Sequence, residues 1–209
     1  MLKYSIVVGL DPGIYGGLCI LEKNKEPLVY KIPLKDIIIN KKKKKEYDLI
    51  EIVKILKPYM NKNVLFIQER VGVHSGEGSV SGFGFGRSSG FTLGIAYALG
   101  FAVIEITPQR WKKHFPELIN DIIREKKKEV KELREEGKIL KDKEEKKQNK
   151  RQIDKLNRKI KAEAKSLARE LASKKYPGLK DKFEKKNTDG LAESLLIGIF
   201  GKDNKSELV

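Results

Sequence analysis

Continuous apolar runs and helical periodicities alternate along the chain and predict a mixed α/β fold. The segment 4–33 predicts a buried strand at 4–11, a Pro/Gly turn, and two further strands near 17–22 and 27–33, which together make a β-meander. DLIEIVKILKPYM (48–60) has apolar residues at helical spacing and predicts a helix with Asp48 as its N-cap. NVLFIQE (63–69) predicts a central strand covered on both faces.

The next part of the chain predicts a loop, a helix and a strand. A glycine-rich loop is expected at 72–90, a helix at about 90–100, and a strand in FAVIEITP that Pro108 closes. A meander followed by helix, strand, helix, strand and helices indicates a mixed sheet sandwiched by helices. At 209 residues the chain suits one domain, 1–209, with a full core.

From about 117 to 161 the composition changes to Lys, Glu and Arg with sparse apolar residues. Two apolar sets at helical spacing flank the polar stretch KDKEEKKQNK and predict an antiparallel helical hairpin that projects from the core. The sets are Ile119, Ile123, Val130, Leu133 and Leu140, then Ile153, Leu156, Ile160, Leu167 and Leu171. Two interpretations of this arm stay open: a solvated or disordered insertion without function, or a basic arm for DNA backbone or a dimer contact.

The charge of the chain indicates a polyanionic partner. It has 45 Lys and Arg against 29 Asp and Glu, a net charge of +16, although a lysine-biased genome would also give runs such as Lys41–Lys45. The single Cys19 excludes an internal disulfide framework and a cysteine-rich zinc site. No apolar run reaches the roughly 18 residues of a membrane span, and the start enters a strand directly. We therefore expect a soluble, cytoplasmic protein with no membrane partner.

Four carboxylates interrupt apolar sequence. Asp11 and Glu69 end the two most apolar strands, and the ends of adjacent central strands are where a sheet presents side chains to a ligand. Asp189 and Glu193 would lie one turn apart on one helix face, where like charges repel. Such a set needs cations, and hard oxygen ligands select Mg²⁺ or Mn²⁺. Two such ions about 4 Å apart can activate a water and stabilise the leaving oxygen in phosphodiester hydrolysis.

These motifs resemble the RuvC-type Holliday-junction resolvases of the RNase H-like superfamily, in particular their phage and organellar branch. The resembling segments are IVVGLDPGIYGGLCIL, VLFIQE, GFGFGRSSGFTLGIAYALGFAVIEITPQRWKKHF and DGLAESLLIG. The resemblance implies an α/β fold with an RNase H-like mixed five-stranded sheet flanked by helices, with the helical hairpin inserted. It also implies a homodimer that nicks four-way DNA junctions symmetrically with Mg²⁺ and leaves ligatable 5′-phosphates.

Carried over residue by residue, Asp11, Glu69, Asp189 and Glu193 match the catalytic, metal-binding positions of that family. The last pair departs from the pattern of some relatives, which have two Asp three residues apart, whereas here Asp and Glu are four apart. Two roles therefore stay open for Asp189, direct metal binding and assistance in proton transfer.

Aromatic and basic residues supply candidate DNA contacts. Phe83 and Phe85 either fold back into the core or stack on bases at the junction centre, where each base–aromatic contact is worth about 1–3 kcal/mol. Arg87 would then pair with a phosphate.

A second basic group follows the strand that Pro108 closes. Arg110, Lys112 and Lys113 form a candidate phosphate patch. Between them, Trp111 is expected to pack in the core or at a hinge. His74 and His114 are expected at the surface.

The sequence predicts a structure-selective endonuclease for branched DNA. The alternative enzyme is an RNase H-like nuclease for an RNA–DNA hybrid or a flap, because a metal site alone does not select the nucleic acid. An alternative of another class is a catalytically idle junction-binding protein, which the complete acidic set disfavours.

Overall fold

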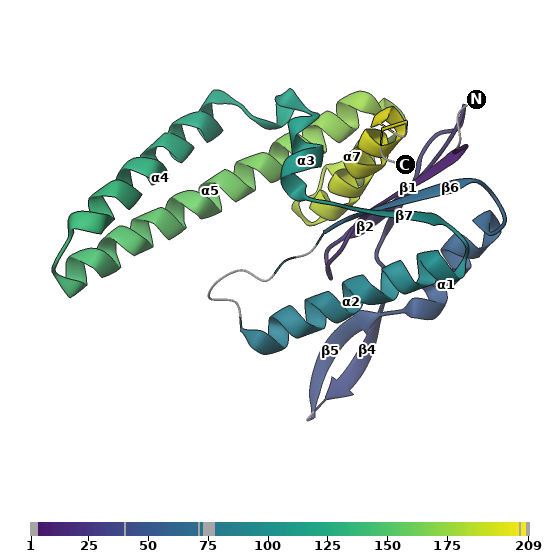
Figure 1. Ribbon diagram of the computed structural model, residues 1–209, viewed down its shortest axis with the longest axis horizontal. Helices are drawn as coiled ribbons and strands as arrows, with labels where there is room; N and C mark the ends of the chain where they lie inside the picture. Colours follow the sequence, from purple (N-terminus) through teal and green to yellow (C-terminus); the bar gives the residue numbers. More distant parts are fainter. Residues whose placement is uncertain (1–3, 40, 71, 73–77, 205, 208–209) are drawn as a thin grey trace.

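The computed structural model describes residues 4–39, 41–70, 72, 78–204 and 206–207. A five-stranded mixed sheet in the order β3-β2-β1-β6-β7 forms its centre (Figure 1). The strands are β1 (Ile6–Asp11), β2 (Gly17–Glu22), β3 (Leu28–Lys31), β6 (Val64–Glu69) and β7 (Ala102–Ile106). β1 to β3 form the antiparallel meander, and β1, β6 and β7 run parallel. The carboxyl ends of β1, β6 and β7 therefore share one edge of the sheet.

Helices cover both faces of this sheet (Figure 1). The longer ones are α1 (Leu49–Leu56), α2 (Ser79–Ala98), α4 (Asp121–Ile139), α5 (Lys143–Lys175) and α7 (Asp189–Asn204), and the shorter ones are α3 (Pro108–Lys113) and α6 (Lys180–Phe183). Single 3-10 turns lie at Lys57–Tyr59, Pro116–Leu118, Pro177–Leu179 and Lys186–Thr188. The predicted α/β architecture, a five-stranded mixed sheet with flanking helices and an inserted helical hairpin, is confirmed.

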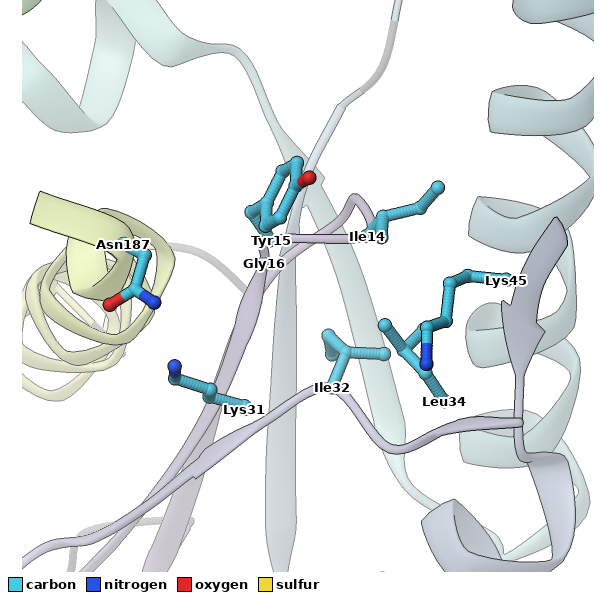
Figure 2. Close-up of a pocket in the computed structure, with 8 residues that line it drawn as sticks. All are labelled: Ile14, Tyr15, Gly16, Lys31, Ile32, Leu34, Lys45 and Asn187. Atoms are coloured by element: carbon cyan, nitrogen blue, oxygen red, sulfur yellow. The ribbon is translucent and has the colours of Figure 1, made fainter. Parts of the chain in front are cut away.

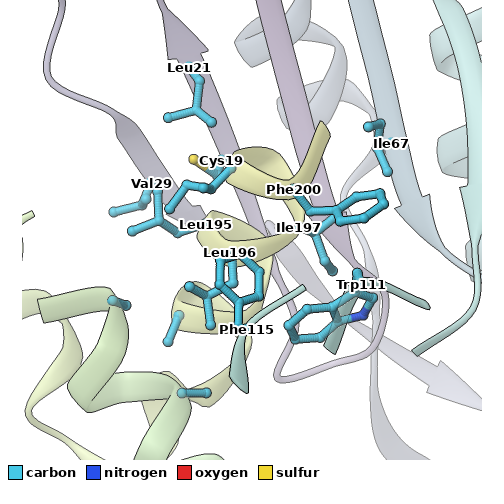
Figure 3. Close-up of a cluster of buried hydrophobic side chains, with 14 of the residues drawn as sticks. Cys19, Leu21, Val29, Ile67, Trp111, Phe115, Leu195, Leu196, Ile197 and Phe200 are labelled. Atoms are coloured by element: carbon cyan, nitrogen blue, oxygen red, sulfur yellow. The ribbon is translucent and has the colours of Figure 1, made fainter. Parts of the chain in front are cut away.

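Alternate side chains of the central strands enter two hydrophobic clusters. Val7 and Ile67 pack with α7, α5 and α3 on one face, whereas Val8 and Phe66 pack with α1 and α2 on the other. Figure 3 shows the first cluster, in which side chains of α7 meet those of β2 and the buried ring of Trp111. Burial on both faces explains why these strands are continuous apolar runs in the sequence.

The prediction of a loop at 72–90 was wrong over 79–90, because α2 already begins at Ser79, whereas 73–77 lie outside the described residues. Glycine weakens an isolated helix, but packing on the sheet outweighs propensity here. The buried Gln68 of β6 donates to Ser89 Oγ over 2.6 Å and accepts from Thr92 Oγ1 over 2.5 Å. These hydrogen bonds satisfy polar groups under the helix and fix its position on the sheet.

A second small sheet was not anticipated. β4 (Leu34–Ile39) and β5 (Lys42–Tyr47) form an antiparallel hairpin, so most of the lysine run attributed to composition bias lies in a strand. Tyr47 at its base is buried. Figure 1 places this hairpin beside α2.

The helical arm is confirmed, and its second helix is longer than expected. α4 and α5 pack side by side and project from the core (Figure 1). Predicted apolar positions such as Val130 and Leu156 are buried between them, whereas Ile119 is 40% exposed. α5 continues past the arm to Lys175, where Ala168 and Leu171 join the core beside α7. Among the described residues, no helix combines the length and the apolar character needed to cross a bilayer.

Candidate active site

Three of the four predicted carboxylates meet at the shared edge of the sheet. Asp11 ends β1 and Glu69 ends β6, and the parallel pairing of these strands places both at the same edge. Glu193 comes from α7, which lies across β1 and β2. The charges of Glu193 and Glu69 both act on Asp11, which shows how close the three groups lie. The structure thus brings together residues that are 58 and 182 positions from Asp11 in the chain.

Glycines bring α7 close enough to the sheet to place Glu193. A Cβ atom at Gly9 of β1 would overlap the backbone of Ser194 and Gly198, and one at Gly17 of β2 would overlap Gly190. Backbone therefore packs directly on backbone at these positions, which only glycine permits. The close approach carries the first turn of α7 to the ends of the strands.

The carboxylate cluster is electrostatically strained without a cation. Burial raises the pKa of Asp11 well above its ordinary value, and the negative charges of Glu193 and Glu69 raise it further. Burial also raises the pKa of Glu69, although its hydrogen bond from Trp111 opposes the shift. Taking carboxylates out of water and placing them together disfavours their ionised forms. A bound cation would reverse that penalty.

Helix α3 supplies two groups to this cluster. Trp111 is completely buried, as predicted for a core residue, and its Nε1–H donates to Glu69 Oε2 over 2.6 Å. Lys112 Nζ lies 3.0 Å from Glu193 Oε1. Burial lowers the pKa of Lys112, but the charges of Glu193 and Glu69 outweigh this effect and raise it. Lys112, which was predicted to contact a phosphate, is therefore paired with a carboxylate of the cluster. The sequence did not predict the hydrogen bond from Trp111.

Asp189 occupies a different environment from the other three acids. Its carboxylate forms ion pairs with Arg169 and, at 3.1 Å, with Lys165, both from α5. Sequence reasoning missed these two residues, although their spacing of four places them on one face of the helix. The two carboxylates of the late pair thus have different partners, because Glu193 pairs with Lys112 at the cluster while Asp189 pairs with the cations of α5.

The donor set fits a hard divalent cation by its chemistry. Asp11, Glu69 and Glu193 offer only oxygen ligands, and their mutual repulsion is what a cation such as Mg²⁺ would relieve. As the side chains lie, however, no group of three or more His, Cys, Asp or Glu in the described ranges is arranged to hold a metal ion. Lys112 and Lys165 supply positive charge near Asp11 instead. Metal binding would therefore involve side-chain rearrangement around a backbone that already groups the donors.

The predicted DNA contacts on α2 differ in exposure. Phe83 is 73% exposed, so the alternative that this ring folds into the core was wrong. Phe85 is half-buried and its ring lies over the turn after Asp11, with Cε2 3.8 Å from where a Cβ at Gly13 would be. Arg87 pairs with Glu46 of β5 at 2.5 Å.

The other candidates on and after α3 lie at the surface. Arg110 and Lys113 are exposed on α3. His114 lies at the surface and pairs with Asp203 at 3.1 Å. His74 lies outside the described residues.

We expect the Trp111→Phe variant to lose about 10–100-fold in Mg²⁺ affinity or activity, the usual effect of removing a hydrogen bond to a metal ligand. Phenylalanine keeps an aromatic ring in the core but cannot donate to Glu69. Calorimetric titration with Mg²⁺ and a thermal melt of the same sample would measure both properties. Unchanged Mg²⁺ affinity in a folded variant would contradict the prediction.

Comparison with known proteins gives two solved structures. No family model and no curated protein matches the sequence. RuvC of Thermus thermophilus in complex with a Holliday junction substrate is 10% identical, with a TM-score of 0.47 over 97% of this chain and 96% of that one. A second Thermus thermophilus RuvC structure is 17% identical, with a TM-score of 0.31 over 52% of this chain and 67% of that one. At such identities and TM-scores these likenesses carry no conclusion about the chemistry of this chain.

Proposed function

We propose that the protein is a Mg²⁺-dependent endonuclease that resolves four-way DNA junctions. The observation that carries the proposal is the group of Asp11, Glu69 and Glu193 at one sheet edge, where burial and mutual repulsion raise the pKa of Asp11. A stable fold that concentrates like charges in this way favours a cation-binding role. The net charge of +16 favours a polyanionic substrate.

The residues of the chain would divide the work of hydrolysis. When bound, Mg²⁺ would polarise the phosphodiester and activate the attacking water, and Mn²⁺ is expected to substitute for it. Asp11, Glu69 and Glu193 would hold the metal, and we propose two ions at this edge. Trp111 would orient Glu69 through its Nε1–H. Asp189, paired with Arg169 and Lys165, would act from outside the metal ligands by positioning these two cations of α5.

The exposed rings and cations around this edge support a DNA substrate. Phe83 is exposed to solvent near the beginning of α2, and Phe85 lies over the turn after Asp11. Stacking on exposed rings requires bases that are not covered by neighbours, which a branch point offers and a regular duplex does not. We propose that this surface selects branched DNA and that Arg110 and Lys113 contact its phosphates.

The direct test compares substrates. A labelled synthetic four-way junction, an RNA–DNA hybrid and a linear duplex are incubated with the protein, with and without Mg²⁺. We expect paired nicks in the junction only, and only with the metal. Cleavage of the hybrid alone would identify a ribonuclease, and binding of the junction without cleavage under any divalent cation would identify an idle junction-binding protein.

We also propose that the protein acts as a homodimer, because two symmetry-related strands of a junction must be cut. The outward face of α2 suits such an interface: Gly94 and Ala98 are exposed, and a Cβ at Gly94 would meet no atom within 4 Å. Phe91 and Tyr97 on this helix are 38% and 64% exposed. Small residues permit close approach of two helices, and the exposed rings supply apolar area.

We expect the Ala98→Glu variant to be monomeric at concentrations where the wild type is a dimer, with a dissociation constant raised at least about tenfold by one desolvated charge. Light scattering at micromolar concentration measures the change. Met60→Glu, which places the same charge on an exposed apolar site outside α2, is the control and should remain dimeric. A monomeric wild type, with and without junction DNA, would refute the dimer.

A further inference from the structure

An exposed tyrosine stands on a rigid turn directly after Asp11. Tyr15 is 81% exposed. The turn beneath it is fixed by two hydrogen bonds, from Gly16 N–H to the Gly13 carbonyl at 2.9 Å and from Gly13 N–H to Tyr47 Oη at 2.6 Å. A ring presented on a fixed backbone can bind a partner with little loss of conformational entropy.

Tyr15 is one of the residues that line a pocket of about 260 Å³ (Figure 2). Its walls come from the turn after β1, the end of β3, the β4–β5 hairpin and the residues before α7. They are formed by Ile14, Tyr15, Gly16, Lys31, Ile32, Leu34, Lys45 and Asn187. The pocket therefore combines an aromatic and aliphatic surface with two lysines and one amide.

One of the two lysines is available to a ligand. Lys31 forms no ion pair with any residue that the structure describes, whereas Lys45 Nζ lies 2.9 Å from Asp36 on the same hairpin. Figure 2 shows the Lys31 side chain extending toward Asn187, on the same side of the turn. An unpaired ammonium beside an amide is suited to a phosphate and a polar base edge.

The pocket also adjoins the carboxylate cluster. Asp11 pairs with Gly17 across β1 and β2, so the turn between them projects immediately beyond the catalytic edge. A Cβ at Gly190 would overlap the Tyr15 carbonyl, which shows that the start of α7 lies against the same turn. A strand whose phosphate reaches Asp11 would therefore pass this pocket.

We infer that the pocket binds one unpaired nucleotide of the DNA strand next to the cleaved phosphodiester, an inference that rests on the proposed function. The base stacks on Tyr15 and Ile14, Lys31 contacts its phosphate, and Asn187 hydrogen-bonds its edge. The volume is smaller than the roughly 300–1,000 Å³ of pockets for drug-sized ligands, which suits a single base. A base inside a regular duplex has both faces covered, so the pocket favours a nucleotide at a branch point.

The test uses synthetic four-way junctions with 2-aminopurine at each branch-point position in turn, bound with Ca²⁺ in place of Mg²⁺. We expect the wild type to change the fluorescence of one position, which identifies the unstacked nucleotide. Tyr15→Ala should abolish that change and weaken junction binding about tenfold, the typical effect of losing one base–aromatic stack. Tyr15→Phe keeps the ring and should behave as the wild type. Binding to linear duplex should not change, because backbone contacts are untouched.

Two charge reversals test the lysine separately. Lys31→Glu should weaken junction binding, whereas Lys23→Glu, at the opposite end of the same pair of strands, should have a smaller effect. A Tyr15→Ala variant with the wild-type affinity and fluorescence change would overturn the inference while leaving the proposed function intact. A wild type that shows the Tyr15-dependent change but cuts no junction with Mg²⁺ would instead support the pocket and refute the nuclease.

Discussion

The Asp11→Asn variant is expected to lose cleavage of four-way junctions while binding them with nearly wild-type affinity. Asparagine keeps the size of the side chain but removes the charge that Asp11 contributes with Glu69 and Glu193. Substituting an outer partner of a metal ligand typically lowers activity about 10–100-fold, so loss of a ligand itself should exceed about 100-fold. Junction binding depends on the basic surface, which the substitution leaves unchanged.

Cleavage and binding should be measured on the same junction, with Asp181→Asn as a matched control. Asp181 is exposed on α6, and its substitution by Asn removes one negative charge outside the cluster. Normal cleavage by Asp11→Asn would refute the assignment of the site. Parallel loss of cleavage and binding would instead indicate a disrupted β1.

The same variant should be more stable than the wild type when no metal is present. The pKa of Asp11 is raised in the fold, so the folded state binds its proton more tightly than the unfolded state does. Stability is therefore lost as the pH rises above the ordinary value of 3.8 toward the folded pKa, and the full penalty applies above that. Asparagine carries no such penalty, so the difference in Tm in EDTA should grow from pH 4 toward neutral pH.

Mg²⁺ should reverse this order of stability between the wild type and Asp11→Asn. At ten times its Kd, a ligand that binds only the folded state stabilises it by about 1.4 kcal/mol. For a chain of this size that corresponds to a rise in Tm of about 3–6 °C. The wild type should show this rise and Asp11→Asn should not. Thermal melts across a Mg²⁺ series measure it, and an equal rise in both proteins would place the metal elsewhere.

The largest expected loss of stability comes from Gly190→Ala. Helix propensity alone favours alanine by up to about 1 kcal/mol. At Gly190, however, a Cβ would overlap the Tyr15 carbonyl and lie 2.5 Å from Gly16 Cα, and neither backbone atom can move without separating α7 from the sheet. Overpacking of this kind typically destabilises by about 1–3 kcal/mol, and rigid backbone on both sides places this site at the upper end.

The control is Gly86→Ala on α2, where a Cβ would meet no atom within 4 Å. At Gly86 only the difference in helix propensity acts, and we expect the free energy of unfolding to rise by about 0.5–1 kcal/mol. Chemical denaturation of the two variants and the wild type measures the change in the free energy of unfolding, which should be a loss for Gly190→Ala and a gain for Gly86→Ala. A stable Gly190→Ala protein would show that α7 does not pack against the turn after β1 as closely as described.

The sequence by itself determined the five strands of the central sheet, the arm and the identity of the acidic residues. Strands buried on both faces must be continuously apolar, so β1 and β6 could be read directly, and the acids that end them, Asp11 and Glu69, stood out against that background. The arm was equally readable, because helical periodicity in a charged segment is a local property of the chain.

The tertiary structure alone decided the extent of α2 and the partners of the acids. Glycine-rich sequence predicts a loop, whereas the structure has a helix from Ser79 whose Ser89 and Thr92 form hydrogen bonds with Gln68, a residue remote in the chain. The same holds for the bond from Trp111 to Glu69 and for the pairing of Asp189 with Arg169. Periodicity reports which face of an element is buried, but it carries no information about which distant residue lies against that face.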